Sequence, residues 1–151
     1  MVVIEDTRQQ KGKHELKHAC FEQMGVELVR NMLPFGDYAI PPKVAIDTKA
    51  NMLEIAHNIG SDHKRFKNEC LSAKNAGCQL IILVENTEGI TCVNDVREWV
   101  NPDLVYRPRS ITGERLSKAM STMAERYGVR FEFCDPEEAA ERIIELLGEQ
   151  I

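Results

Sequence analysis

The spacing of apolar residues predicts that strands and helices alternate along the whole chain. Short apolar runs, often rich in β-branched residues, predict strands, which we place at 2–6, 26–33, 37–40, 44–48, 79–85 and 129–133. Apolar residues that recur every three or four positions predict amphipathic helices, which we place at 13–24, 51–77, 93–99, 112–127 and 135–147. A break near Gly60 divides the helix at 51–77 in two.

The order of these elements, β-α-β-β-β-α-β-α-α-β-α, favours one class of fold. Three early strands follow one another, whereas helices separate the later strands. This order is typical of an α/β protein with a mixed sheet between two layers of helices. We therefore expect a three-layer α/β/α sandwich with a central mixed β-sheet. No repeat, low-complexity tract or linker divides the sequence, so we expect residues 1–151 to form a single domain.

The first predicted helix carries a regular stripe of apolar residues. Leu16, Cys20 and Met24 are four positions apart, which places them on one side of a helix. Gly25 suits the end of this helix, because glycine readily adopts the left-handed conformation found there. We expect the stripe to pack against the sheet.

Composition and charge narrow the classes of protein without choosing one. The formal charge of −5 gives no general basic field, although clustered positive charge and a bridging cation can still hold a polyanion. The five cysteines form no C-x-x-C pair, so the common zinc and redox motifs are not supported and reduced thiols are favoured. We find no signal peptide and no apolar stretch long enough to span a membrane. We therefore expect a cytoplasmic protein without membrane contact.

Two neighbouring predicted strands carry side chains that suit a divalent metal. Because side chains alternate along a strand, Asp47 and Lys49 share one face, while Val44 and Ile46 point to the other. Asp37 opens the preceding strand, and the short connection between the strands returns it toward Asp47. Two carboxylates at this distance in sequence are plausible ligands of Mg²⁺ or Mn²⁺, which prefer oxygen.

Hydrolysis of a phosphodiester needs what such a site supplies. The cation polarises the phosphoryl group and acidifies a bound water. Lys49 can position or deprotonate that water, or stabilise the developing negative charge. The spacing of Asp47 and Lys49 is weak as a signal by itself, because surface ion pairs on edge strands have the same spacing.

The residues around this site match a longer pattern of motifs in the same order. The matching segments are Asp6-Thr7-Arg8-Gln9, Leu33-Pro34-Phe35-Gly36-Asp37-Tyr38, Asp47-Thr48-Lys49 and Arg65-Phe66-Lys67-Asn68-Glu69-Cys70, followed by the apolar strand at 79–85. They resemble the D-x-R-E, L-x-x-G-D-Y, E-R-K and R-[LF]-x-x-Q-C elements of the XPF family of structure-specific endonucleases, within the PD-(D/E)xK superfamily. The resemblance covers roughly residues 2 to 147.

This resemblance implies a restriction-endonuclease-like fold and a Mg²⁺- or Mn²⁺-dependent endonuclease acting on branched or flapped DNA, as in DNA repair or recombination. It assigns catalysis to Asp6, Asp37, Asp47 and Lys49, with Asp37 and Asp47 as the metal ligands. It assigns substrate binding to Arg8, Arg65 and Lys67.

The family also suggests how the chain is assembled. Its nuclease domain commonly pairs with a second copy or a paralogue, so we expect a homodimer or a partner subunit. A helix-hairpin-helix module for DNA binding usually accompanies the domain, and no such module is present in residues 1–151. Either a partner supplies DNA binding or the nuclease domain binds DNA alone. The departures from the family pattern resemble those of a divergent, small branch of the kind carried by phages and prophages.

Several positions depart from the family pattern. Asp47 stands for Glu, which keeps the charge and shortens the ligand, and Thr48 stands for Arg, which removes a cation near the phosphate. Gln9 stands for the Glu of D-x-R-E, and only Glu54 is close to the acid expected after the lysine. These changes leave the three superfamily positions intact and reduce the set of accessory residues.

Two alternatives to this function remain open. The chain could be a catalytically inactive DNA-binding or scaffolding subunit that activates a partner, although such subunits are marked by loss of the acid or the lysine. It could also be a PD-(D/E)xK enzyme of another specificity, such as a junction resolvase or an RNA-directed nuclease.

Other basic residues do not belong to any of these motifs. Arg107, Arg109 and Arg115 form a basic run that could bind flanking DNA. His57 and His63 flank the predicted helix break and could lie near the mouth of the active site. The sequence assigns neither group a role.

Overall fold

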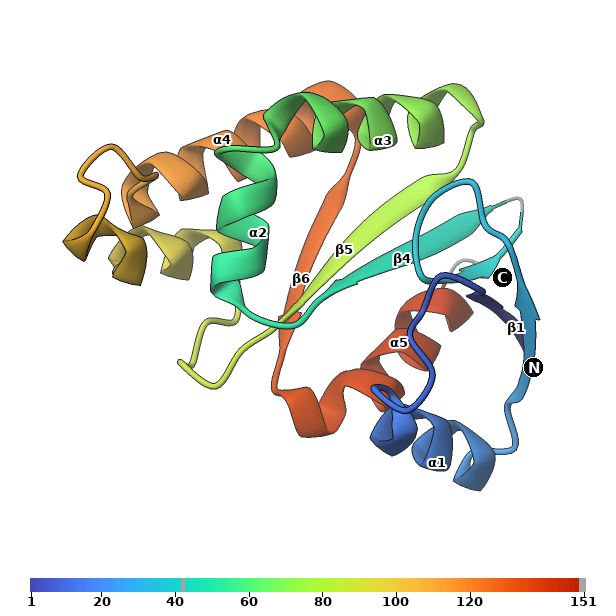
Figure 1. Cartoon of the computed structure of the whole chain (residues 1–151). Coiled ribbons are helices and arrows are strands. Elements are labelled where there is room, and N and C mark those ends of the chain that lie inside the picture. Colours follow the sequence, from blue (N-terminus) through green and yellow to red (C-terminus); the bar gives the residue numbers. More distant parts are fainter. Residues whose placement is uncertain (42, 150–151) are drawn as a thin grey trace.

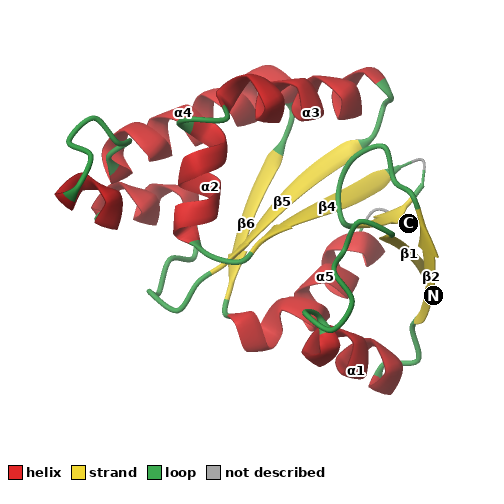
Figure 2. Cartoon of the chain, in the orientation of Figure 1, coloured by secondary structure: helices red, strands yellow, loops and turns green. Residues whose placement is uncertain are grey.

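A computed structural model of the chain describes residues 1–41 and 43–149 and shows a six-stranded mixed sheet between two layers of helices (Figures 1 and 2). The strands are β1 (Val2–Asp6), β2 (Glu27–Asn31), β3 (Tyr38–Ile40), β4 (Val44–Lys49), β5 (Gln79–Glu85) and β6 (Arg130–Cys134). They lie in the order β2-β1-β3-β4-β5-β6. Only β3 runs antiparallel to its neighbours. The predicted α/β/α sandwich with a mixed sheet is confirmed.

The helices divide between the two faces of this sheet. The α-helices are α1 (Glu15–Gln23), α2 (Met52–Ile59), α3 (His63–Asn75), α4 (Gly113–Tyr127) and α5 (Ala139–Gly148), and the 3-10 helices are η1 (Val93–Glu98), η2 (Pro102–Val105) and η3 (Pro136–Glu138). The core that includes α2, α3 and α4 covers one face, and α1 and α5 cover the other (Figure 1). The predicted division of the 51–77 helix near Gly60 is confirmed, since α2 ends at Ile59 and α3 begins at His63.

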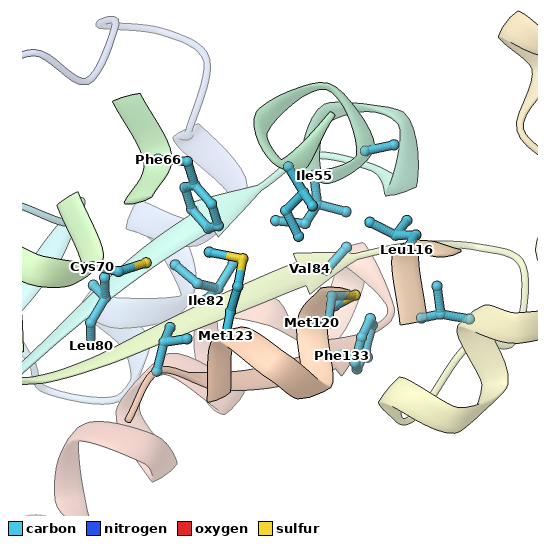
Figure 3. Close-up of a cluster of buried hydrophobic side chains, with 14 of the residues drawn as sticks. Ile55, Phe66, Cys70, Leu80, Ile82, Val84, Leu116, Met120, Met123 and Phe133 are labelled. Carbon is cyan, nitrogen blue, oxygen red and sulfur yellow. The ribbon is translucent and has the colours of Figure 1, made fainter. Parts of the chain in front are cut away.

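The central strands are apolar because both of their faces are buried, as expected for parallel strands between helices. In β5, Ile81 and Leu83 pack with α5, whereas Leu80, Ile82 and Val84 pack with α2, α3 and α4. Figure 3 shows this second cluster, in which side chains from the helices interlock with those of β5 and β6. The larger core therefore fixes α2 and α3 against the end of β4 that carries the predicted site.

The buried face of α1 differs from the prediction. Leu16 and Met24 are 66% and 43% exposed, whereas Phe21 is 1% exposed and packs edge-on against Tyr38. The side of α1 toward the sheet also carries charged groups: the Lys17 Nζ lies 2.9 Å from an oxygen of Glu85, and His18 Nε2 lies 2.5 Å from an oxygen of Glu5. Because Lys17 and His18 pair with buried carboxylates at the strand ends, α1 turns a partly polar face toward the sheet. Their partners could not be deduced from the spacing of apolar residues.

Smaller features of the sequence are also reflected in the structure. The predicted helix at 93–99 is the 3-10 helix η1, and Asp135 begins the last helical segment by accepting a hydrogen bond from the Glu137 backbone N at 3.0 Å. The Pro41-Pro42 break falls partly on residue 42, which lies outside the described residues. All five cysteines are free thiols. Within residues 1–41 and 43–149, no helix is both long and apolar enough to cross a membrane.

Candidate active site

Three adjacent strands bring the predicted acidic residues to one edge of the sheet. Asp6 ends β1, Asp37 immediately precedes β3, and Asp47 lies on β4. The backbone N of Asp6 donates to the carbonyl of Asp37 at 2.8 Å, and the backbone N of Asp37 donates to the carbonyl of Ile46 at 2.6 Å. Asp37 is therefore held between the other two strands by its own backbone.

Gly36 makes this close approach possible. Its φ of +79° lies in the left-handed region that disfavours L-residues with a side chain. A Cβ at this position would lie 3.1 Å from both the Cβ of Ala45 and the carbonyl oxygen of Ile46. Position 36 therefore requires glycine for two reasons: the turn needs a positive φ, and β4 lies too close for a side chain.

The acidic residues open into a cleft of about 450 Å³ between the sheet edge, α2 and the start of α3. Its charged and amide side chains are Asp6, Arg8, Asp37, Asp47, Lys49, Glu54, Asn58, Asp62, Arg65 and Glu69. Six of these side chains are carboxylic acids, and three are lysine or arginine. This excess of carboxylates suits a cation.

Asp47 and Lys49 form the centre of the cleft. As predicted from strand alternation, they share the face of β4 turned toward α3, and the Nζ of Lys49 lies 2.9 Å from Oδ2 of Asp47. Both side chains are largely buried. The Nζ also lies 5.6 Å from the centre of the Phe66 ring on α3, a geometry in which the aromatic face attracts a cation. The ammonium group is therefore fixed by one carboxylate and one ring.

Asp37 is oriented by the residue between this pair. Its Oδ2 accepts hydrogen bonds from the backbone N and from the hydroxyl Oγ1 of Thr48, each at 2.7 Å. These two bonds use one oxygen, and none of the side-chain hydrogen bonds among the described residues engages Oδ1. Thr48, which stands where the family pattern has an arginine, thus holds the Asp37 carboxylate.

The cleft shifts the ionisation of the central pair. Burial raises the pKa of Asp47 well above its usual range; Lys49 lowers it, and the nearby carboxylates of Asp37 and Glu69 raise it further. Burial lowers the pKa of Lys49, but attraction to Asp47 and to other carboxylates outweighs this effect and leaves that pKa raised. Lys49 therefore remains an ammonium ion at neutral pH, and the carboxylates around it repel one another.

Asp6 and Arg8 are bound to each other at the rim. Oδ2 of Asp6 accepts from Nε of Arg8 at 2.6 Å, and Oδ1 accepts from the backbone N of Leu33 at 3.0 Å. Arg8 in turn donates to the carbonyl of Leu33 at 2.6 Å. Both oxygens of Asp6 are thus engaged in holding the chain that leads to Gly36. Its geometry suits support of the loop better than direct contact with a metal.

The two predicted basic residues of α3 are placed differently. Arg65 lines the cleft, and the described residues offer it no carboxylate within ion-pair distance. Lys67 does not line the cleft. Arg8 also lines it, with its guanidinium paired to Asp6.

Several polar residues of the cleft were not predicted as site residues, among them Glu69, Glu54 and Asn58. Glu69 accepts a hydrogen bond from the backbone N of Gly36 at 3.3 Å, and Glu54 accepts one from the backbone N of Ala50 at 2.7 Å. Asn58 lies one helical turn after Glu54, and its Oδ1 is buried without a hydrogen-bond partner among the described residues. Glu69 could have been found, because it stands at the Gln position of the R-[LF]-x-x-Q-C element.

The donor set fits a hexacoordinate cation that keeps water ligands. Within the described part of the chain, no three His, Cys, Asp or Glu side chains are gathered as a preformed metal cage. Mg²⁺ needs no such cage, because one or two carboxylates with waters and substrate phosphate commonly hold it. Asp37 and Asp47 are the candidates for these carboxylates, and the buried, unpartnered Oδ1 of Asn58 offers a further polar group in the same cleft.

Comparison with known sequences identifies the chain's relatives. The sequence model of the ERCC4 domain matches residues 5–147. This match spans the strands and helices that form the cleft, from the end of β1 to α5. No curated protein matches the chain.

Solved structures support the same relationship at the level of the fold. XPF from Aeropyrum pernix has 21% sequence identity and a TM-score of 0.69, with 99% of this chain and 61% of that chain covered. The structure of XPF from Aeropyrum pernix in complex with DNA has 21% identity and a TM-score of 0.68, with 98% and 63% covered. The chain thus spans about three fifths of these proteins. Neither structure supports the predicted phage or prophage branch.

Proposed function

The chain belongs to the ERCC4 domain family, and on that premise we propose that it is a Mg²⁺- or Mn²⁺-dependent DNA endonuclease. The observation that carries this proposal is the meeting of Asp37, Asp47 and Lys49 in a cleft with more carboxylates than basic groups. Phosphodiester hydrolysis requires a cation site beside a group that can stabilise negative charge, and this cleft contains candidates for both.

In this proposal Asp37 and Asp47 hold the cation. Asp37 is held in place by its two hydrogen bonds from Thr48, which leave its second oxygen available. Asp47 is held by Lys49. Burial, together with repulsion from Asp37 and Glu69, makes the charge of Asp47 costly until a cation arrives. The bound Mg²⁺ or Mn²⁺ would polarise the scissile phosphate and acidify water.

Lys49 is the residue that we assign to the reacting phosphate. Its ammonium is buried beside Asp47 and Phe66, where it has few other positions to adopt. From there it can donate to the attacking water or to a phosphate oxygen as negative charge develops. Fixed donors in a cleft with limited water stabilise such charge more strongly than solvent does.

Two arginines provide candidate phosphate contacts around this centre. Arg65 lines the cleft without an ion-pair partner among the described residues, and a free guanidinium suits a phosphate because two of its N–H groups can bind two oxygens. Arg8 is paired with Asp6 and stiffens the loop before Gly36. We therefore assign Asp6 a positioning role, and Lys67 has no placement that supports substrate contact.

The substrate and the assembly are proposed from the family. Branched or flapped DNA is the substrate class of the XPF family, and the solved XPF from Aeropyrum pernix includes a complex with DNA. This chain spans only about three fifths of that protein. Because the family's nuclease domain commonly pairs, we propose a second copy or a partner subunit as the assembly. Residues 1–151 would then act as one nuclease domain.

Cleavage of labelled DNA tests the proposal. Flap, fork and duplex DNA would be incubated with Mg²⁺ or Mn²⁺ and either the wild type or Asp47→Ala, with Glu98→Ala on η1 as a surface control. Metal-dependent cleavage by the wild type and the control, but not by Asp47→Ala, is the expected result. Retained binding of branched DNA without any cleavage would instead favour a scaffolding subunit.

A further inference from the structure

A second cavity of about 720 Å³ lies on the other side of α2 from the acidic cleft. It is enclosed by the end of α2, the beginning of α3 and the segment from 101 to 119. In Figure 1 the segment containing η1 and η2, coloured olive to orange, lies on one side of α2, and β4 and β5 lie on the other. The two hollows therefore share α2 as a common wall.

The charge of this cavity is opposite to that of the acidic cleft. Its basic side chains are His57, His63, Arg107, Arg109 and Arg115, and its only carboxylate among the described residues is Asp103. That carboxylate is engaged by the Nε2 of His57 at 2.7 Å, a contact that also ties η2 to α2. Because Asp103 is paired with His57, the three arginines determine the charge of the cavity lining.

Six of the ten arginines form no ion pair among the described residues, and three of these six line this cavity. Arg8, Arg30, Arg130 and Arg142 each form an ion pair with a carboxylate. Within residues 1–41 and 43–149, Arg107, Arg109 and Arg115 form none. Three guanidinium groups that line one hollow without a carboxylate partner suit an anion with several charges.

The cavity also receives two helix N-termini. α4 begins at Gly113 beside Arg115, and α3 begins at His63. In α3 no side chain caps the first turn, since Asp62 accepts no hydrogen bond from it through its side chain. At α4 the Thr112 hydroxyl already accepts from the backbone N of Arg115, so that terminus contributes through its helix dipole, whereas α3 contributes both uncapped N–H groups and its dipole. They add to the field of the arginines.

A shallow hollow of about 410 Å³ connects the cavity to the acidic cleft. It is lined by Ser61, Asp62, Lys64, Arg65 and Asn68. Asp62 and Arg65 also line the acidic cleft, and Ser61 also lines the second cavity. The first turn of α3 thus forms a path along which Arg65, Lys64 and His63 lead from one hollow to the other.

We propose that the second cavity binds backbone phosphates of the DNA strand that leaves the acidic cleft. This inference rests on the proposed nuclease function. Carboxylic acids outnumber basic side chains in the acidic cleft, whereas Arg107, Arg109 and Arg115 supply the unpaired positive charge that successive phosphates need. Tyr106, which is 86% exposed and precedes Arg107, is available to stack on a base of the same strand. In this arrangement the acidic cleft carries out catalysis, and the second cavity binds the strand.

The salt dependence of DNA binding tests this inference. Binding of a labelled flap DNA would be measured by fluorescence anisotropy at several salt concentrations, using protein that carries Asp47→Ala so that cleavage plays no part. In this background we compare Arg107→Ala/Arg109→Ala/Arg115→Ala with the corresponding triple lysine variant. Arg126→Ala, at the far end of α4 and also outside any ion pair of the described residues, is the matched control. Thermal unfolding establishes that each variant is folded.

The triple alanine variant is expected to bind at least about tenfold more weakly. The slope of log K against log salt concentration should shrink by about 2, because each lost phosphate contact removes roughly 0.7 to 0.9. The lysine variant should keep most of the slope, and Arg126→Ala should behave as the parent. Equal affinity and slope in the alanine variant, or no DNA binding by the Asp47→Ala parent, would overturn the inference. Cleavage by the wild type is scored separately and decides the proposed function.

Discussion

The carboxylate of Asp37 is held by Thr48 through two hydrogen bonds of 2.7 Å, one from the backbone N and one from the hydroxyl. Thr48 lies between Asp47 and Lys49 on β4. In the proposed function, one short strand segment therefore provides a metal ligand, the lysine that acts on the phosphate and the residue that orients the second metal ligand. Thr48 stands where the family pattern has an arginine, so a residue bonded to Asp37 takes the place of a cation in this chain.

This relationship predicts that the Thr48 hydroxyl affects metal affinity. Thr48→Val keeps the shape of the side chain and removes one of the two hydrogen bonds to Asp37, so the affinity for Mn²⁺ should fall about tenfold, as is common when a residue that supports a ligand is lost. Thr48→Ser should retain it. Isothermal titration calorimetry measures both. An unchanged affinity in Thr48→Val would show that the hydroxyl does not orient a metal ligand.

Metal binding should also stabilise the folded protein. A cation that binds only the folded state adds to the free energy of unfolding as its concentration rises above the dissociation constant, by about 2.7 kcal/mol at a hundredfold excess. Mn²⁺ should therefore raise the Tm of the wild type, and EDTA should reverse the shift. Asp47→Ala should show little response. A shift of the same size in both proteins would place the stabilising cation elsewhere.

Gly113 should be intolerant of a substitution that normally favours helices. In a helix, Gly→Ala usually stabilises by about 1 kcal/mol. Here a Cβ would overlap the carbonyl oxygens of Val96 and Trp99 in and next to η1. Gly113→Ala should therefore destabilise the protein by about 2 kcal/mol through overpacking. Urea unfolding measures the change, with Lys118→Ala on the exposed side of α4 expected to be nearly neutral; a stabilised Gly113→Ala would contradict the packing of α4 on η1.

The thiols should react in the order of their exposure and ionisation. Burial raises the pKa of Cys70 and of Cys134 to about 12, so both thiols are buried and protonated at pH 8. Cys92 is exposed. Iodoacetamide at pH 8 should modify Cys92 first and should reach Cys70 and Cys134 only on unfolding, since the thiolate is the reactive form. Mass spectrometry of timed digests measures this order, and early modification of Cys70 would contradict the core around α3.

The central site could be predicted because it depends on short-range rules. Side-chain alternation along β4 puts Asp47 and Lys49 on one face whatever the rest of the fold does, and the short connection to β3 limits where Asp37 can lie. The motif spacing then distinguishes these residues from an ordinary surface ion pair. The order of elements was likewise sufficient for the fold class, because few arrangements bury such a set of strands and helices.

Other features depend on contacts between distant segments and could not be predicted. The buried face of α1 is decided by Glu5 and Glu85, two strand-end carboxylates whose partners are apparent only in the folded chain. The second cavity arises because the fold brings Arg107 and Arg115 to line the same hollow as His57 of α2. In the sequence they are a basic run without a motif, and their arrangement around a hollow is a property of the fold.

The most direct test of the account is the single-turnover rate of DNA cleavage at saturating Mn²⁺ by wild type and Lys49→Met. Methionine keeps much of the length and apolar character of the buried side chain and removes the ammonium beside Asp47. The account predicts metal-dependent cleavage by the wild type and a rate at least about 10²-fold lower in the variant, the usual size of the effect when a donor to developing charge is lost. Equal rates, or cleavage by the wild type that persists in EDTA, would contradict it.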